Sequence, residues 1–68
     1  MTPEEKWEIR MNIILDFEDG LLSEDEFNSK IIEFDEKYED KEYLKWILEN
    51  IYPKGSKTYN YYLKKYQA

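Results

Sequence analysis

Carboxylates are the side chains of this 68-residue sequence that could do chemistry, because it has sixteen Asp and Glu residues and no His or Cys. Without an imidazole or a thiol, the three serines, Ser23, Ser29 and Ser56, have no neighbouring base to activate them as nucleophiles. A carboxylate pair such as Glu33 and Glu36 could in principle act as general acid and base. We predict a solvated acidic helix face there instead, and therefore no catalytic residues and no enzymatic activity.

One acidic segment resembles a calcium-binding loop. An EF-hand loop aligned on Gly20 would place Asp19 at its fifth position and Glu26 at its twelfth. Its first and third positions would be Leu15 and Phe17, which have no side-chain oxygen, whereas calcium takes about six or more oxygen ligands. A helix end followed by a capped helix start accounts for the whole segment. We therefore predict no metal site and no cofactor.

The charged residues divide the sequence into an acidic part and a basic part. Residues 1–50 contain all sixteen carboxylates and six basic side chains, which gives a formal charge of −10. Residues 51–68 contain four lysines, five tyrosines and no carboxylate, which gives +4. Charge separated in this way influences partner choice and encounter rate. The pattern therefore indicates a binding surface.

The length predicts a single small helical domain spanning residues 1–68. A domain of this size buries only about 60% of the surface of its unfolded chain, and no Cys or His is present for a disulfide or a zinc site. The two Trp, three Phe and seven Tyr must then supply most of the buried apolar area. No apolar run approaches the roughly 20 residues that cross a bilayer, and the N-terminus does not resemble a signal peptide. We expect a soluble, cytoplasmic protein.

The start of the chain predicts a helix over residues 3–19. Thr2 and Glu5 have the spacing of a capping box, Pro3 suits the first helical position, and Gly20 provides the stop. Apolar side chains cover a wide arc of this helix. It therefore needs two neighbouring helices or a second chain.

Three further helices are predicted, each beginning after a polar N-cap residue. They are expected over residues 24–39 after Ser23, residues 41–52 after Asp40 and residues 57–66 after Ser56. In the second helix Phe27, Ile31, Phe34 and Tyr38 form one apolar stripe, with Ile32 on the opposite side. The sequence thus predicts an all-α fold, a compact bundle of four short helices joined by short loops.

The segment between the first two helices resembles a known domain family. Residues Gly20-Leu21-Leu22-Ser23-Glu24-Asp25-Glu26-Phe27, followed by Lys30, are similar to the signature of the SHOCT (short C-terminal) domain. The resemblance covers roughly residues 6–34, and it implies a small helical hairpin used for association rather than for chemistry. Here the hairpin continues into two more helices, so no functional residue is transferred from the family.

The acidic helices are the first candidate binding surface. Carboxylates spaced three, four and seven residues apart could present charges much as a nucleic acid presents phosphates. The candidate residues are Asp25, Glu26, Glu33, Glu36 and Asp40. We expect a protein partner with a basic surface, such as a nuclease or another nucleic-acid-binding protein. The protein would then be a DNA-mimic inhibitor of the phage or mobile-element type. Because lysines interrupt the acidic row, an ordinary solvated helix surface remains the alternative.

The basic end of the chain offers a second candidate surface. Lys57, Tyr61, Lys64 and Lys65 share one face of the last helix and could contact phosphates and stack on a base. The acidic remainder of the molecule would repel the same polyanion, so we expect direct nucleic-acid binding to be weak. The lysines could instead complement the helix dipole and fold back onto the acidic helices as counterions.

Self-association is the third possibility. Tyr43 and Trp46 flank the core stripe of the third helix, and the first helix has a wide apolar arc, so apolar surface could be left over for a homodimer. The candidate interface residues are Trp7, Ile9, Ile13 and Trp46. The same residues could equally complete the core of a monomer.

Overall fold

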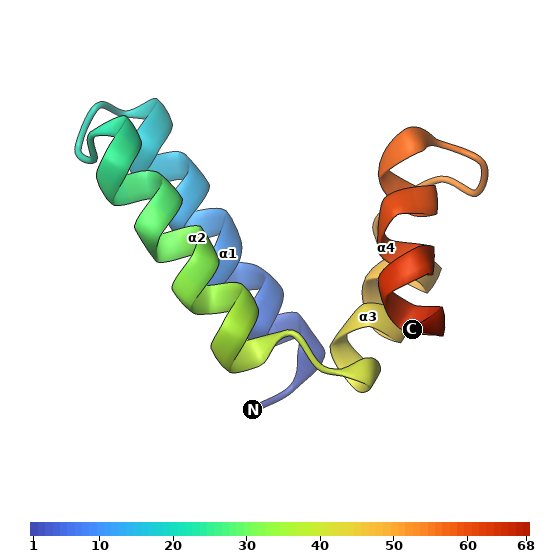
Figure 1. Ribbon diagram of the computed structural model, residues 1–68. Coiled ribbons are helices and arrows are strands. Elements are labelled where there is room, and N and C mark those ends of the chain that lie inside the picture. Colours follow the sequence, from blue (N-terminus) through green and yellow to red (C-terminus); the bar gives the residue numbers. More distant parts are fainter.

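The computed structural model describes all residues, 1–68, and forms an all-α bundle of four helices without strands (Figure 1). The helices are α1 (Pro3–Glu18), α2 (Glu24–Tyr38), α3 (Lys41–Asn50) and α4 (Lys57–Gln67). The predicted fold class is therefore confirmed. None of the four helices is both long and apolar enough to cross a membrane.

All four helices begin after the N-cap residue that the sequence predicts. The caps are Thr2, Ser23, Asp40 and Ser56, whose side-chain oxygens accept hydrogen bonds of 2.9–3.2 Å from the backbone N–H three residues later. In α1 and α2 the capping box is complete, because the glutamate three residues after the cap accepts a hydrogen bond from the N–H of the cap residue. The caps satisfy N–H groups that have no partner within the helix.

The helix ends lie within two residues of the predicted ones. α1 and α2 each end one residue early, at Glu18 and Tyr38, and α4 ends one residue late, at Gln67. α3 ends at Asn50 instead of residue 52: Ile51 is its C-cap, and Tyr52 directly precedes Pro53. A residue that precedes proline disfavours the helical region, which accounts for the early end.

The four helices form two hairpins that diverge from a shared base (Figure 1). We call residues 1–38, with α1 and α2, the N-terminal hairpin, and residues 39–68, with α3 and α4, the C-terminal hairpin. α1 packs against both α2 and α3, so it has the two neighbours that its wide apolar arc requires. Gly20 turns the first hairpin in the left-handed conformation (φ 78°), which costs glycine little.

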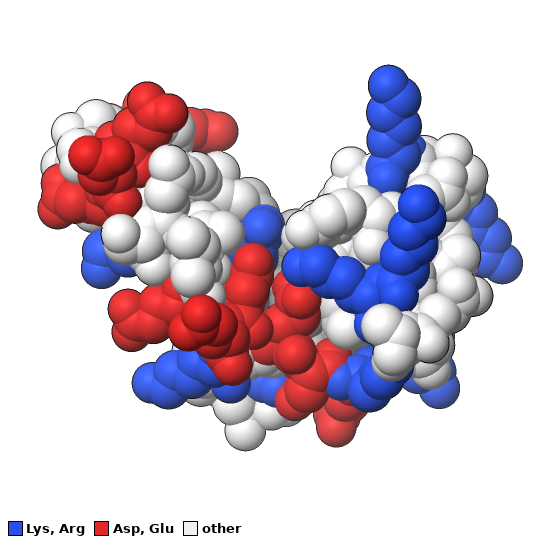
Figure 2. All heavy atoms as spheres, in the orientation of Figure 1, with Lys and Arg blue, Asp and Glu red and all other residues white.

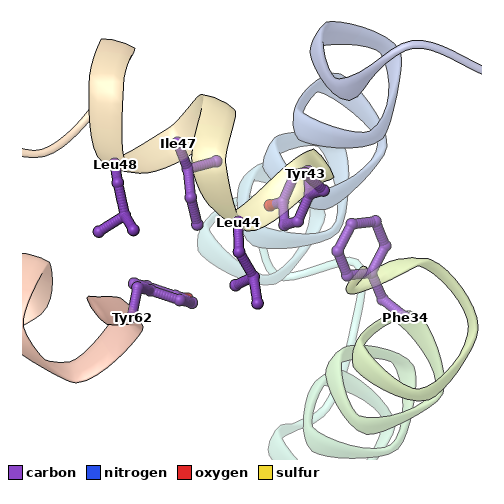
Figure 3. Close-up of a cluster of buried hydrophobic side chains, with 6 residues drawn as sticks. All are labelled: Phe34, Tyr43, Leu44, Ile47, Leu48 and Tyr62. Carbon is purple, nitrogen blue, oxygen red and sulfur yellow. The ribbon is translucent and has the colours of Figure 1, made fainter. Parts of the chain in front are cut away.

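The buried core lies at the base of the two hairpins and comes mainly from α3 (Figure 3). Its six residues are Phe34, Tyr43, Leu44, Ile47, Leu48 and Tyr62. Tyr62 approaches from α4 and Phe34 from α2, on either side of α3. Tyr43 meets Phe34 edge to face, with ring centroids 5.8 Å apart. The core is thus rich in aromatic side chains, as the composition predicts.

Tyr43 corrects one expectation from the sequence. It does not add spare apolar surface beside the core stripe of α3, because it is one of the two most enclosed side chains, at 1% exposure. Burial raises the pKa of Tyr43 well above its usual value and raises the pKa of Tyr62 to about 12. Both phenols therefore stay uncharged in the folded protein at neutral pH.

Candidate protein-binding surface

The two hairpins differ strongly in charge. The N-terminal hairpin contains twelve carboxylates and four basic side chains, a formal charge of −8, whereas the C-terminal hairpin contains four carboxylates and six basic side chains, a charge of +2. Figure 2 shows acidic side chains spread over the N-terminal hairpin and lysines projecting from the C-terminal one. The charge boundary in the fold is therefore at residue 38, twelve residues earlier than the boundary drawn from the sequence.

The ion pairs all use carboxylates of the C-terminal hairpin. They are Lys6–Asp40 at 2.6 Å, Lys65–Glu39 at 2.9 Å and Lys45–Glu49 at 4.0 Å. None of the twelve carboxylates of the N-terminal hairpin has a cation within 4.0 Å. The carboxylates of this hairpin are consequently not held in close ion pairs within the molecule.

Three of the five residues predicted for the acidic face have no side-chain partner within the protein. Asp25, Glu33 and Glu36 are exposed on α2 and make no side-chain hydrogen bond or ion pair. The middle of α2 is nevertheless mixed in charge, because Lys30 and Lys37 line the same open groove as Glu33. This groove has a volume of about 250 Å³ and is floored by apolar side chains of α1 and α2. A uniformly acidic surface must therefore lie elsewhere on the hairpin.

The other two predicted acidic residues, Glu26 and Asp40, accept hydrogen bonds from other residues of the protein. Glu26 accepts a hydrogen bond from the backbone N–H of Ser23, which lowers the pKa of Glu26. Asp40 accepts a hydrogen bond from Lys6 Nζ at 2.6 Å and one from the N–H of Tyr43 at 2.9 Å, and these bonds lower the pKa of Asp40. Lys6 lies 34 positions from Asp40, so helix periodicity could not reveal the pair.

The end of the N-terminal hairpin that points away from α3 combines acidic and exposed apolar side chains. We call residues 14–27 the hairpin end. It contains six carboxylates and no Lys or Arg: Asp16, Glu18, Asp19, Glu24, Asp25 and Glu26. Leu15, Phe17 and Leu21 are 47%, 36% and 72% exposed, and the ring of Phe17 stacks on that of Phe27 at 4.4 Å. The hairpin end is thus uniformly acidic and only partly covered.

Acidic side chains at the end of α1 oppose the helix dipole. The last turn of α1 contains Glu18 and no basic residue, and Asp19 follows as the C-cap. The C-terminus of a helix carries partial negative charge, so nearby carboxylates destabilise it and lysines stabilise it. α4 shows the favourable arrangement, with Lys64 and Lys65 in its last turn. The carboxylates at the end of α1 therefore do not contribute to helix stability.

The predicted basic face of α4 is only partly free. Lys57 and Lys64 are exposed without ion pairs, and Tyr61 is 56% exposed. Lys65 is half-buried, pairs with Glu39 at 2.9 Å and lies 4.8 Å from the ring centroid of Tyr61. Partial burial disfavours the charged form of Lys65, but the interactions with Glu39 and Tyr61 together outweigh this effect and raise the pKa of Lys65. Lys65 is thus an internal counterion and not part of a free surface.

The residues predicted for an apolar interface lie against the core. Trp7, Ile9, Ile13 and Trp46 are half-buried and pack against the buried cluster, and Trp7 meets Tyr52 edge to face at 6.1 Å. The exposed large apolar side chains are Leu15, Phe17 and Leu21 at the hairpin end, and Met1, Ile32 and Tyr61 elsewhere. Sequence reasoning missed the hairpin end, although Leu21 directly follows the turn glycine, where helix packing cannot cover a side chain.

No known protein family, curated protein or solved structure matches this chain. The likeness of residues 20–30 to the SHOCT signature therefore stays a sequence-based prediction. The structure contains no group of three or more His, Cys, Asp or Glu side chains placed to hold a metal ion. The hairpin end and the exposed carboxylates of α2 are the surface on which a functional proposal can be based.

Proposed function

We propose that this protein is a non-enzymatic binding module whose N-terminal hairpin engages a basic surface of another protein. The main support is the charge of −8 on that hairpin, with no carboxylate of the hairpin in an ion pair. Lys and Arg side chains of a partner would supply the missing countercharges. Complementary charge of this kind accelerates encounter and favours the correct partner over neutral or acidic ones.

A nucleic-acid-binding protein is the partner class that we propose. Asp25, Glu33 and Glu36 are exposed along α2 and span about 16 Å at 1.5 Å per residue. Cations arranged to bind phosphates could meet carboxylates distributed in this way. Occupation of such a site would block it, so the protein would act as an inhibitor of the DNA-mimic type. A phage or mobile-element context and a cytoplasmic location belong to the same proposal.

We propose that the basic side chains of the C-terminal hairpin contribute less to binding than the N-terminal hairpin does. Lys57, Lys64 and the exposed ring of Tyr61 are the residues that a nucleic acid could contact directly. The hairpin as a whole carries only +2, beside a hairpin of −8. Repulsion by the larger charge makes a protein partner the better-supported choice.

Affinity capture at two salt concentrations tests the proposal. The immobilised protein is incubated with lysate at low salt, and we expect basic, nucleic-acid-binding proteins to be recovered and then lost as the salt concentration rises. A captured set without excess basic proteins, or capture that does not depend on salt, contradicts the proposal.

Charge reversal then identifies the surface that binds the recovered partner. We expect the double variant Glu33→Lys and Glu36→Lys to weaken its binding about tenfold to a hundredfold. The matched control is Lys57→Glu with Lys64→Glu, which changes two exposed charges on the other hairpin and should leave binding unchanged or tighter. The proposal is wrong if the control variant loses more affinity than the test variant.

A further inference from the structure

We propose that the partner docks at the hairpin end, residues 14–27, and that the docking segment is a cationic amphipathic helix. Such a helix carries a row of aliphatic or aromatic side chains flanked by Lys and Arg. The inference rests on the proposed function, and it adds the place of contact and the chemistry of the partner. Three properties of the hairpin end support it: uncovered apolar side chains, uniform negative charge and a backbone without free hydrogen-bonding edges.

Three apolar side chains of the hairpin end are only partly covered by the rest of the chain. Leu15, Phe17 and Leu21 are the exposed ones. α3 contacts the N-terminal hairpin at its opposite end, and the hairpin end projects away from α3 and α4 (Figure 1). Burial of exposed apolar surface is the dominant favourable contribution to most protein associations. A partner that covers these side chains therefore gains affinity that charge alone does not supply.

The charge of the hairpin end selects a cationic partner. Six carboxylates and no basic residue occur between Arg10 and Lys30, and the C-terminus of α1 adds the negative end of its dipole. The middle of α2 differs, because Lys30 and Lys37 lie beside Glu33. Lys and Arg around the apolar row of a partner would find six carboxylates at the hairpin end, which itself contains no Lys or Arg.

The backbone of the hairpin end favours a helix over an extended strand as the docking segment. In α1 and α2 the backbone N–H and C=O groups are bonded within the helices, and the turn adds bonds such as Leu21 N–H to the Asp16 carbonyl at 2.9 Å. No edge remains for an added strand. A docking segment must then satisfy its own backbone, as an amphipathic helix does.

Other occupants fit the hairpin end less well. A second copy docked end to end would bring six carboxylates against six. The α4 helix of a second copy offers Lys57 and Lys64, but its apolar face, with Tyr62 and Leu63, is packed against its own core. Anionic lipid and nucleic acid would both be repelled. A cationic amphipathic helix satisfies the apolar and the electrostatic requirement together.

The test is an NMR titration of the ¹⁵N-labelled protein with designed peptides. The probe is a 14-residue helix of Leu and Lys with all Leu on one face, and the matched peptide carries Ser in place of Leu. We expect the Leu–Lys peptide to shift the amide resonances of residues 14–27 and to bind about tenfold more tightly than the Ser–Lys peptide.

Matched protein variants test the assigned side chains. The double variant Leu15→Ser and Leu21→Ser should bind the Leu–Lys peptide about tenfold more weakly than the unchanged protein. The variant Ile32→Ser removes an apolar side chain of similar exposure, 58%, from outside the hairpin end and should bind as the unchanged protein does. Amide spectra of each free variant confirm that the fold is retained.

Each alternative result separates this inference from the proposed function. Shifts centred on Glu33 and Glu36, or equal binding of the two peptides, leave an acidic binding surface intact but overturn docking at the hairpin end. Shifts of the hairpin end that depend on protein concentration without peptide assign it to a second copy. Absence of binding at low salt also overturns the inference, whereas the capture experiment decides the proposed function independently.

Discussion

The C-terminal hairpin of this protein holds most of the buried core, whereas the N-terminal hairpin holds most of the unpaired carboxylates. Five of the six buried core residues belong to the C-terminal hairpin, and only Phe34 comes from the N-terminal one. Three of the four carboxylates of the C-terminal hairpin are in ion pairs, whereas none of the twelve in the N-terminal hairpin is. The C-terminal hairpin thus supplies most of the core and pairs most of its carboxylates. The N-terminal hairpin has unpaired carboxylates and exposed apolar side chains that a partner could contact.

The comparison predicts that equal substitutions have unequal effects in the two hairpins. Ile47→Ala, in the C-terminal hairpin, truncates a side chain that is 0% exposed. The lost contacts and the resulting cavity should cost about 2–5 kcal/mol. A single core in a domain this small supplies about 3–5 kcal/mol, so we expect the variant to be largely unfolded at 25 °C. Far-UV circular dichroism during thermal and urea denaturation measures the effect.

Ile32→Ala is the matched control in the N-terminal hairpin. The same atoms are removed from a side chain that is 58% exposed, so the free energy of unfolding should change by about 0.5 kcal/mol or less. If the two variants lost similar stability, the core would extend further into the N-terminal hairpin than its burial indicates.

The second prediction concerns the ion pairs. Glu39→Gln removes the charge that Lys65 contacts at 2.9 Å, where both side chains are largely shielded from solvent, and should cost about 1 kcal/mol at neutral pH. Glu49→Gln is the control, because the Lys45–Glu49 contact is 4.0 Å long and exposed. Its loss should be too small to measure. Urea denaturation of both variants and the unchanged protein provides the comparison.

The contribution of the Lys65–Glu39 pair should depend on pH in one direction. The pKa of Lys65 is raised above 10.5 in the folded protein, so the folded state holds this proton more tightly than the unfolded state. The stabilisation is fully present below pH 10.5 and is lost as pH rises through the folded pKa. The difference between Glu39→Gln and the unchanged protein should therefore shrink above pH 10.5, because Lys65 loses its proton and with it the charged hydrogen bond to Glu39. A difference that persists there contradicts the assignment.

The smallest predicted effect is a gain in stability at the hairpin end. Glu18→Lys places a cation in the last turn of α1, where the helix dipole favours it, and should stabilise the protein by about 0.5 kcal/mol. The control Glu4→Lys makes the same exchange in the first turn and should destabilise by a similar amount. Thermal denaturation at low ionic strength measures both. If Glu18→Lys also weakens partner binding, acidity at this end serves recognition at the expense of stability.

Much of the fold could be predicted because it depends on local chemistry. The caps at Thr2, Ser23, Asp40 and Ser56 involve bonds within three residues, so a short segment of sequence contains all the information. The apolar stripe on α2 could also be predicted from the sequence: Phe34 of the stripe is buried, and Ile32 on the opposite side is exposed. Local geometry decides both features.

The candidate surface was less predictable because it depends on how the hairpins meet. α1 is apolar around a wide arc, so periodicity could not decide which of its side chains α3 covers. The structure packs Trp7 and Ile9 against the core and leaves Leu15 uncovered. The pairing of Lys65 with Glu39 joins residues 26 positions apart, and it withdraws one lysine from the basic face that the sequence predicted.

The position of the core along the chain also sets the order in which the protein can fold during synthesis. Four of its six buried residues lie in α3, from Tyr43 to Leu48, and Tyr62 comes later still, in α4. The N-terminal hairpin emerges from the ribosome first, yet it has no buried cluster of its own. It can form helical turns early, but the complete core cannot assemble until α3 and α4, which supply five of its six residues, have also left the exit tunnel.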